Sequence, residues 1–514
     1  MREFHDLPRN RRAAGAGGRL VVISGTAARG SGTASRTGTD TTSQERDMTA
    51  VSAPQAAPVR VAAAPGWGTL LVLLTGIFVT SLDFFIVNVA IPATQRDLHA
   101  TASQIQFVVA GFGVALAAGL ITAGRLGDLY GRRRMYAIGL AVFTLASAAC
   151  AEASTAGMLI GARVAQGVGA AILMPQVLGI VNTVYTGPAR ARAFNAYGIA
   201  MGFGGVFGQL IGGVLIKADI AGMGWRAIFW INVPVGAAAL ALIPRLVPES
   251  RANGASRLDP VGTVLASLGL VAIVYPLVQG SAQDWPMWTW ECLGAAAVLL
   301  AAFALHQRRA AAPLVAPALF RHRSFAAGAV VALLHSMTMG SFFLILALYL
   351  QVGRGLSALE SGLIFLPLGI GYFVSSARAA GVAERLGRQT VALGALAMAL
   401  GLGVLAVTAA DLGQDGAVAW IIPGLVAAGA GMGLVMAPLP ALVLSRVDAE
   451  HAGAASGVLS TAQQAGGAIG VALVGVVFYG VHGGVPHAFS AGLVFLLVLD
   501  VLVAALVQAL PKAR

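Results

Sequence analysis

The feature that most constrains this chain is a series of apolar runs, each about 20 residues long, that recurs from Leu70 to the C-terminus. An α-helix rises about 1.5 Å per residue, so each run is long enough to cross a bilayer core of about 30 Å. We count fourteen runs, near residues 68–92, 103–124, 135–152, 157–180, 195–217, 226–247, 259–279, 291–307, 325–350, 358–380, 390–409, 417–443, 453–480 and 488–510. The sequence therefore predicts an all-α membrane protein with fourteen transmembrane helices.

The composition agrees with a chain whose solvent is the lipid bilayer. Hydrophobic residues make up 57% of the sequence and charged residues 11%, which is too apolar for a water-soluble protein of this length. The net charge of +12 does not indicate a nucleic-acid partner, because the basic residues lie in loops and in the N-terminal tail without a basic face. Cys150 and Cys292 have neither the number nor the spacing of a disulfide framework or a metal site. We expect no metal and no cofactor.

The first 66 residues differ from the rest. They are rich in Arg, Gly, Ala, Ser and Thr, and they contain no apolar run long enough for a signal peptide. We expect residues 1–66 to form a disordered cytoplasmic tail. Met48 follows this polar stretch and precedes a short leader, so the start of the native protein is either Met1 or Met48.

The positive charges predict the orientation of the chain. Of the 33 Lys and Arg residues, most of those beyond the tail lie at alternate ends of the predicted helices, and Arg96, Lys217, Arg226 and Arg354 lie at the opposite ends. Basic residues concentrate on the cytoplasmic side of membrane proteins. This pattern predicts a plasma-membrane protein with an even number of spans and both termini in the cytoplasm.

A charged segment from Gly124 to Arg134, G-R-L-G-D-L-Y-G-R-R-R, separates the second and third apolar runs. We expect a short loop in which glycines let the backbones approach, while Asp128 lies just past the helix end and pairs with arginine. The segment resembles the loop motif of the major facilitator superfamily, G-x-L-x-D-x-x-G-R-[KR]-[KR]. The resemblance implies a conformational latch formed by Gly124, Asp128, Gly131, Arg132 and Arg133.

The chain also repeats itself. Glu384, Gly387 and Arg388 match Asp128, Gly131 and Arg132 at an offset of 256 residues, and a second set of matches relates the fourth span to the twelfth. Such repeats are typical of transporters built from two halves with the binding site between them. The resemblance implies a major facilitator fold with six-helix halves at 68–247 and 325–510, and two additional helices at 258–308.

Asp83 and Arg163 fall inside predicted spans, where each charge costs about 2.5–3.5 kcal/mol. Asp83 lies in L-D-F-F-I-V-N-V-A-I-P, and Arg163 shares a helix face with Gln166. The first segment resembles the first-span motif of the fourteen-span drug:proton antiporters. In that family the acid is thought to carry the proton, and the arginine of the fourth span is assigned to proton transfer. We therefore expect Asp83, Arg163 and Gln166 to couple transport to protons, with Arg163 as the counter-charge.

The fifth span contains a stripe of small residues, within G-F-G-G-V-F-G-Q-L-I-G-G. This segment resembles the antiporter motif of the same family, with a glutamine where the family normally has proline. Glutamine keeps the N–H that proline would remove, and it adds an amide to the interior. The motif residues are Gly204, Gly208, Gln209, Gly212 and Gly213.

The resemblance implies a non-enzymatic, monomeric secondary transporter that exports small amphipathic drugs or antibiotics in exchange for protons. A proton-coupled uptake symporter of the same fold and a membrane sensor that does not transport are the alternatives. The expected partners are the lipid bilayer, a small-molecule substrate and protons. Asp500 in the last span is a further intramembrane acid, His335 is expected to be a packed helical residue, and Asp259 is expected to cap a helix.

Overall fold

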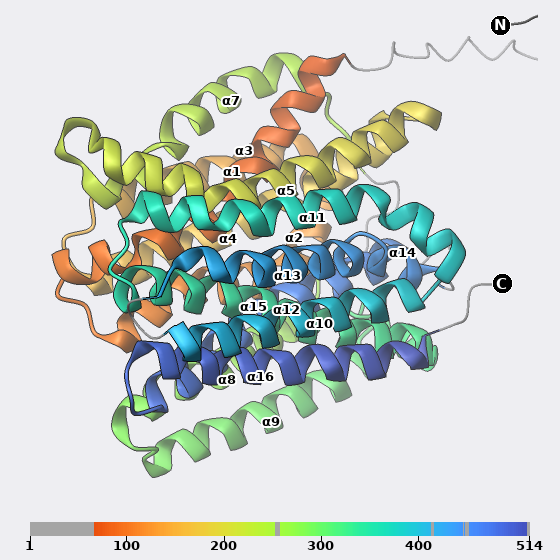
Figure 1. Cartoon of the computed structure of the whole chain (residues 1–514). Helices are drawn as coiled ribbons and strands as arrows, with labels where there is room; N and C mark the ends of the chain where they lie inside the picture. Colours follow the sequence, from red (N-terminus) through yellow and green to blue (C-terminus); the bar gives the residue numbers. More distant parts are fainter. Residues whose placement is uncertain (1–65, 252–257, 413–415, 446, 448–451, 511–514) are drawn as a thin grey trace, which may run out of the picture. The chain divides into compact units, whose positions relative to one another are not determined.

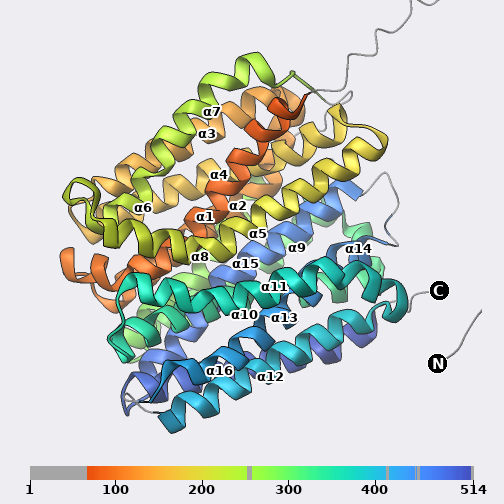
Figure 2. The same cartoon turned by 45° about the horizontal axis from the view of Figure 1, so that its top comes forward.

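The structure is a computed structural model that describes residues 66–251, 258–412, 416–445, 447 and 452–510. Nearly all of the predicted tail and both candidate start residues lie outside these ranges. Within them the regular structure is entirely helical (Figure 1 and Figure 2).

Fourteen spans of the described chain are long and apolar enough to cross a membrane, which confirms the predicted all-α fold. Most spans are one continuous helix: α1 (Trp67–Asp97), α2 (Ala102–Tyr130), α3 (Arg132–Ala151), α4 (Ala156–Val184), α5 (Gly187–Ala218), α8 (Pro260–Gly280), α9 (Met287–Arg309), α11 (Ala358–Leu386), α12 (Gln389–Leu412), α15 (Ala452–Gly480) and α16 (Val485–Leu506).

The sixth, ninth and twelfth spans are compound. They consist, in order, of η2 (Gly224–Arg226), α6 (Ala227–Trp230) and α7 (Asn232–Leu246); of α10 (Arg323–Leu348) and a π-helical turn η5 (Tyr349–Gly353); and of η6 (Val418–Ile421), α13 (Ile422–Met436) and α14 (Leu439–Leu444). Short 3₁₀ turns complete the described chain: η1 (Ile220–Gly222), η3 (Ser281–Gln283), η4 (Pro317–Arg321) and η7 (Val507–Ala509).

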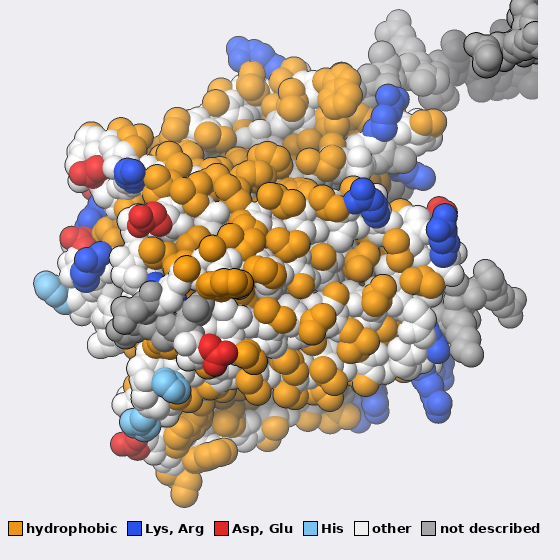
Figure 3. Space-filling view, viewed as in Figure 1, with side chains coloured by type: hydrophobic (Ala, Val, Ile, Leu, Met, Phe, Trp, Pro, Cys, Tyr) orange, Lys and Arg blue, Asp and Glu red, His pale blue; other side chains and the backbone are white. Residues whose placement is uncertain are grey.

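Polar residues just outside the apolar runs fix where several helices begin. Thr101 forms a capping box with Gln104 at the start of α2, and Ser357 forms one with Glu360 at the start of α11. Each pair satisfies two backbone N–H groups that the first helical turn leaves free. Side-chain types are distributed along the length of the helices. In Figure 3 hydrophobic side chains cover the surface between the two ends of the molecule, and most charged side chains lie toward those ends.

Asp259 caps α8, as predicted. Its Oδ1 accepts a hydrogen bond from the Gly262 N–H at 2.8 Å, and Nε2 of both His306 and Gln307 lies 2.8 Å from the carboxylate. Burial raises the pKa of Asp259, but the hydrogen bonds from Gly262, His306 and Gln307 outweigh it, so the pKa lies below its ordinary value. This carboxylate therefore joins the start of α8 to the end of α9.

Equivalent positions of the first six and the last six spans make equivalent contacts. A Cβ added at Gly167 of α4 would lie 2.4 Å from the Phe112 carbonyl oxygen of α2, and one added at Gly429 of α13 would lie 2.0 Å from the Leu368 carbonyl oxygen of α11. Within the first six spans, α4 packs on α2 and α3, and α1 packs on α5. Within the last six, α13 packs on α11 and α12, and α10 packs on α15.

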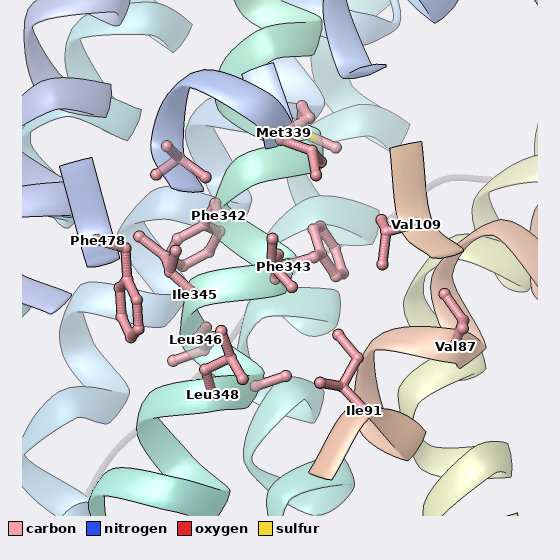
Figure 4. Close-up of a cluster of buried hydrophobic side chains, with 14 of the residues drawn as sticks. Val87, Ile91, Val109, Met339, Phe342, Phe343, Ile345, Leu346, Leu348 and Phe478 are labelled. Atoms are coloured by element: carbon pink, nitrogen blue, oxygen red, sulfur yellow. The ribbon is translucent and has the colours of Figure 1, made fainter. Parts of the chain in front are cut away.

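The first and last six spans meet mainly where α5 packs on α11 and α2 packs on α15. The core between them is apolar and aromatic. Figure 4 shows the side chains of α10 between α1 and α2 on one side and Phe478 of α15 on the other. The rings of Phe343 in α10 and Phe85 in α1 have centroids 4.8 Å apart. Helix α8 lies against both α2 and α15, and α9 packs on α8.

The expected loop from Gly124 to Arg134 is wrong in one respect. Helix α2 continues through this segment to Tyr130, and the chain turns only at Gly131, whose φ is +102°. Asp128 therefore lies in the last turn of α2 and not beyond it. A charged helical turn at the membrane surface needs no loop, because its side chains reach water while the backbone stays hydrogen-bonded.

Candidate functional site

A buried ion pair lies in the interior of the first six spans. Asp83 of α1 and Arg163 of α4 are both fully buried, and Nη1 of Arg163 donates to Oδ2 of Asp83. Arg163 is thus the counter-charge of Asp83, as predicted. The arginine Nε also donates to the Val108 carbonyl oxygen of α2 at 3.0 Å, so three helices converge on this guanidinium group.

A set of polar side chains surrounds the carboxylate. Nε2 of Gln166 lies 2.8 Å from Oδ1 of Asp83, and Nδ2 of Asn232 in α7 lies 2.9 Å from the same oxygen. The Gln166 Oε1 accepts from Nη1 of Arg163 at 2.7 Å, and its amide donates to the Ser147 hydroxyl of α3 at 2.7 Å. Both oxygens of the carboxylate are thus held by donors, which stabilises its charged form.

Apolar rings close the site on the side of the arginine. Cζ of Arg163 lies 4.5 Å from the centroid of the Phe112 ring and 5.8 Å from that of Phe229. An aromatic face attracts a cation and excludes water. Within the described chain, Nη2 of Arg163 has no hydrogen-bond partner. The site is therefore a fully buried ion pair in which one guanidinium nitrogen has no partner among the described residues.

Asn232 and Ser147 complete this network, and neither was among the predicted site residues. Asn232 was visible in the sequence as the polar residue of W-R-A-I-F-W-I-N-V-P-V-G, residues 225–236, inside an otherwise apolar span. Ser147 gave no signal, because a helical serine usually bonds its own helix, as this one does to the Phe143 carbonyl oxygen at 2.9 Å.

The stripe of small residues in α5 faces α1. An added Cβ would lie 2.8 Å from the Leu82 backbone nitrogen at Gly204 and 2.6 Å from a Val89 methyl at Gly212, and at Gly208 it would lie 3.3 Å from the Leu82 carbonyl oxygen. Gly213 instead faces α11, where an added Cβ would lie 2.5 Å from the Ala358 carbonyl oxygen. Close packing of helix backbones requires small residues at such positions.

Gln209 is buried on the same helix, and α5 continues through this residue without interruption. Its Nε2 donates to the Phe85 carbonyl oxygen of α1 at 2.9 Å. This residue therefore ties α5 to the segment of α1 that follows Asp83. Gly362 of α11 packs against its backbone, with an added Cβ only 2.7 Å from the Gln209 carbonyl oxygen.

The predicted latch residues lie together at the junction of α2 and α3. Oδ1 of Asp128 lies 2.7 Å from Nη2 of Arg132, and Nη1 of Arg132 donates to the Gly179 carbonyl oxygen of α4 at 3.1 Å. Oε1 of Glu249 accepts from the backbone N–H of Arg133 at 3.0 Å. These contacts join α2, α3, α4 and the segment after α7.

The two glycines predicted for the latch differ in how closely they are packed. An added Cβ at Gly131 would lie only 2.9 Å from the carboxylate of Glu249, whereas one at Gly124 would lie 3.7 Å from Pro175 of α4, an ordinary van der Waals distance. The residue of this motif that reaches the segment before α10 is Arg125, which was not among the predicted latch residues. Its Nη1 donates to the Ala312 carbonyl oxygen at 2.8 Å, and its Nη2 donates to that of Pro313.

Asp500 lies elsewhere, in the last six spans, beside His335 of α10. The described residues contain no group of three or more His, Cys, Asp or Glu side chains that could hold a metal ion.

Comparison with known proteins identifies the class. Residues 73–471 match the family model of the Major Facilitator Superfamily, and the chain belongs to this family. It is a multi-pass protein of the plasma membrane and a transporter that acts on small molecules.

Three individual relatives are similar to the chain over most of its length. The chain is 37% identical over 423 residues to a probable actinorhodin transporter of Streptomyces coelicolor, with 81% of this chain and 73% of that protein covered. It is 37% identical over 456 residues to the puromycin resistance protein pur8 of Streptomyces alboniger, with 85% and 89% covered. It is 34% identical to the tetracenomycin C resistance and export protein of Streptomyces glaucescens, with 80% and 76% covered.

Solved structures agree on the fold. The chain superimposes on a D-xylose-proton symporter with a TM-score of 0.63 at 14% identity, covering 87% of this chain and 98% of the other. A POT family transporter in complex with a thioalcohol conjugated peptide gives a TM-score of 0.64 at 14% identity, with 85% and 95% covered.

Proposed function

We propose that this protein exports small amphipathic compounds, of the antibiotic or drug class, in exchange for protons by alternating access. The direction and the compound class rest on similarity to the three Streptomyces proteins, which are named for actinorhodin transport, puromycin resistance and tetracenomycin C resistance and export. The proton coupling rests on the buried pair of Asp83 and Arg163.

That pair carries the proposal because its net charge depends on a single proton. With Asp83 ionised the pair is neutral, and with Asp83 protonated it leaves one positive charge on Arg163, which stays protonated in proteins. Gln166 and Asn232 hold the carboxylate through Oδ1, so a proton that arrives at Oδ2 displaces only the arginine contact. Binding of a proton thereby breaks the ion pair between Asp83 and Arg163, and its release restores the pair, while Gln166 of α4 stays bonded to Asp83 of α1.

The energy of this exchange is sufficient for uphill export. One charge moved across 100 mV yields about 2.3 kcal/mol, and each unit of pH gradient yields about 1.4 kcal/mol. One proton can thus raise the concentration ratio of a neutral compound by more than about a hundredfold.

We further propose that residues 68–247 and 325–510 move as two halves, with 258–308 as an addition, and that the carrier works as a monomer. Both termini are cytoplasmic in this proposal. The junction of α2 and α3 then lies on the cytoplasmic side, where Asp128, Arg132 and Arg133 form the latch that holds one conformation. Making and breaking the contact of Arg132 with Gly179 accompanies the change between conformations.

The experiment compares Asp83→Asn with Asp97→Asn in sealed vesicles that contain a pH-sensitive dye. Both acids lie on α1, but Asp97 pairs with Arg226 at the end of the helix, outside the buried network. A susceptibility panel in a strain that lacks its own exporters first identifies a transported compound. We then measure uphill movement of that compound together with proton release.

We expect Asp83→Asn to bind the compound but to lose both uphill transport and compound-dependent proton release. Asp97→Asn should keep both activities. If the Asp83→Asn vesicles still move the compound uphill with an intact proton signal, Asp83 has only a structural role and the proposed coupling is wrong.

A further inference from the structure

A second buried carboxylate lies in the last six spans. Asp500 of α16 and His335 of α10 are almost completely inaccessible, with 0% and 1% of their side chains exposed, and Nδ1 of the histidine lies 3.5 Å from Oδ1 of the acid. This separation is beyond the usual range of about 2.7–3.2 Å for N–H···O hydrogen bonds. Among the described residues, neither ring nitrogen and neither carboxylate oxygen has a hydrogen-bond partner.

The surroundings offer no permanent counter-charge. The helices packed against α10 and α16 are α1, α12, α14 and α15. In the described chain, α14 and α15 carry no Asp, Glu, Lys, Arg or His, and α12 carries only Asp411, near its end. Arg388, just before α12, donates to the Gln508 carbonyl oxygen. On α1, Asp83 is paired with Arg163, and Arg96 and Asp97 lie in the last turn of the helix, where Asp97 pairs with Arg226.

The remaining neighbours lie toward the ends of the two helices. Arg321 of η4 and Arg323 are at the start of α10, Arg354 follows η5, and His487 is at the start of α16. His335 is the ionisable residue of the described chain that lies beside the Asp500 carboxylate. The pair is therefore an isolated acid and base in an apolar interior.

Its position parallels that of the first site. Asp83 lies between the first and last helices of the first six spans, because its Oδ1 accepts from Asn232 of α7. Asp500 lies between α16 and α10, the last and first helices of the last six spans. The partners differ, since Arg163 is a guanidinium, which stays charged in proteins, whereas His335 is an imidazole, which exists in a neutral and a protonated form.

We propose that His335 and Asp500 form a second proton-binding site, which is loaded and emptied during the transport cycle. With one proton the pair is neutral, as imidazolium with carboxylate or as imidazole with carboxylic acid. Release of that proton to water leaves a net charge of −1, and uptake of another gives +1. Either net charge is unfavourable in an apolar interior. The proton is therefore exchanged when α10 and α16 separate enough to admit water.

Infrared difference spectroscopy tests proton binding without any substrate. The full chain in liposomes is titrated with pH, and the C=O stretching band of protonated carboxyl groups is followed in the wild type, Asp500→Asn, His335→Gln, Asp83→Asn and Asp411→Asn. We expect Asp500→Asn to lose one pH-dependent component that Asp83→Asn and the control Asp411→Asn retain. His335→Gln keeps that carboxyl and should shift the midpoint of its component by about one pH unit or more.

Identical titrations of the wild type and Asp500→Asn would overturn the proposal. An unchanged midpoint in His335→Gln would also overturn the proposal. This variant keeps the Asp500 carboxyl, so it tests the site even if Asp500→Asn fails to insert into the membrane. The role of the site in transport rests on the proposed function. In the vesicle assay Asp500→Asn should release one proton fewer per compound than the wild type, and an unchanged number would refute that role.

The two proposals fail in different ways. If the wild type releases no protons with any transported compound, the proposed antiport is wrong, while the infrared titration still decides whether His335 and Asp500 bind a proton. If the wild type is proton-coupled and the infrared component of Asp500 is absent, only the second site is wrong.

Discussion

Removal of the charge of Asp83 should destabilise the protein through the cation that remains. In Asp83→Asn, Arg163 stays fully buried and keeps only two other acceptors, the Val108 carbonyl oxygen at 3.0 Å and Oε1 of Gln166 at 2.7 Å. Loss of one partner of a buried ion pair costs about 3–5 kcal/mol. Because two acceptors and the Phe112 ring still stabilise the guanidinium group, we expect a cost near the lower limit, about 3 kcal/mol.

A second substitution separates this cost from the loss of the carboxylate itself. Asp83→Asn combined with Arg163→Met removes the unpaired cation and fills its space with a flexible apolar side chain. We expect the double variant to recover most of the lost stability, to within about 1 kcal/mol of the wild type, since buried ion pairs are often replaced by apolar groups without loss. Both variants should remain inactive in uphill transport.

The assay is unfolding by SDS in mixed micelles, followed by tryptophan fluorescence, for the wild type, the two single variants and the double variant. The coupling free energy of the cycle measures how far the two residues depend on each other. Equal stabilities for Asp83→Asn and the double variant would refute the argument, because the cost could then not come from the unpaired arginine.

Three other outcomes are expected. Gly167→Val should lower the free energy of unfolding by at least about 1–3 kcal/mol in the same assay, because its Cβ would lie 2.4 Å from a carbonyl oxygen of α2, whereas Gly161→Val, with open space around it, should cost less than about 1 kcal/mol. Asp259→Asn should lower the stability at neutral pH. Because the folded state lowers the pKa of this carboxyl, its contribution is present above about pH 4 and is lost as the pH falls through the lower folded-state value, so thermal unfolding of the two proteins should converge in acid. Single cysteines at Arg133 and Arg388 should react with an impermeant thiol reagent only from the cytoplasmic side, and labelling of either from outside intact cells would refute the proposed orientation.

The spans could be predicted because each one carries its own apolar run, and that information is local. Their interruptions could not be predicted in the same way. The sixth span is broken between Trp230 and Asn232, and the twelfth between Met436 and Leu439, although both read as continuous apolar runs. The end of α2 was placed too early, because hydropathy falls at Arg125 while the helix continues to Tyr130. Hydropathy reports the solvent of a side chain and not the hydrogen bonding of the backbone.

The first site was predictable to the extent that burial of charge limits the choices. Asp83 and Arg163 had to find partners, and each is the other's partner. The residues that bond to this ion pair depend on how the helices are rotated about their axes. Asn232 was therefore visible as a polar residue in an apolar span, but its contact with Asp83 could not be predicted from the sequence. For the same reason Asp500 and His335 were considered separately, although packing of α10 against α16 brings them together.

Helix α8 touches helices from both sets of six spans, but it is attached to them differently. On α2 it is fixed by the hydrogen bond between the Thr122 and Thr263 hydroxyls at 2.7 Å and by the stacked rings of Phe107 and Tyr275. Leu270 of α8 is buried in an apolar cluster that also contains Ala468 and Val471 of α15. Apolar surfaces slide past one another more easily than hydrogen-bonded ones. In a carrier whose halves rock, α8 and α9 would therefore move together with the first six spans, and α15 would shift along the surface of α8.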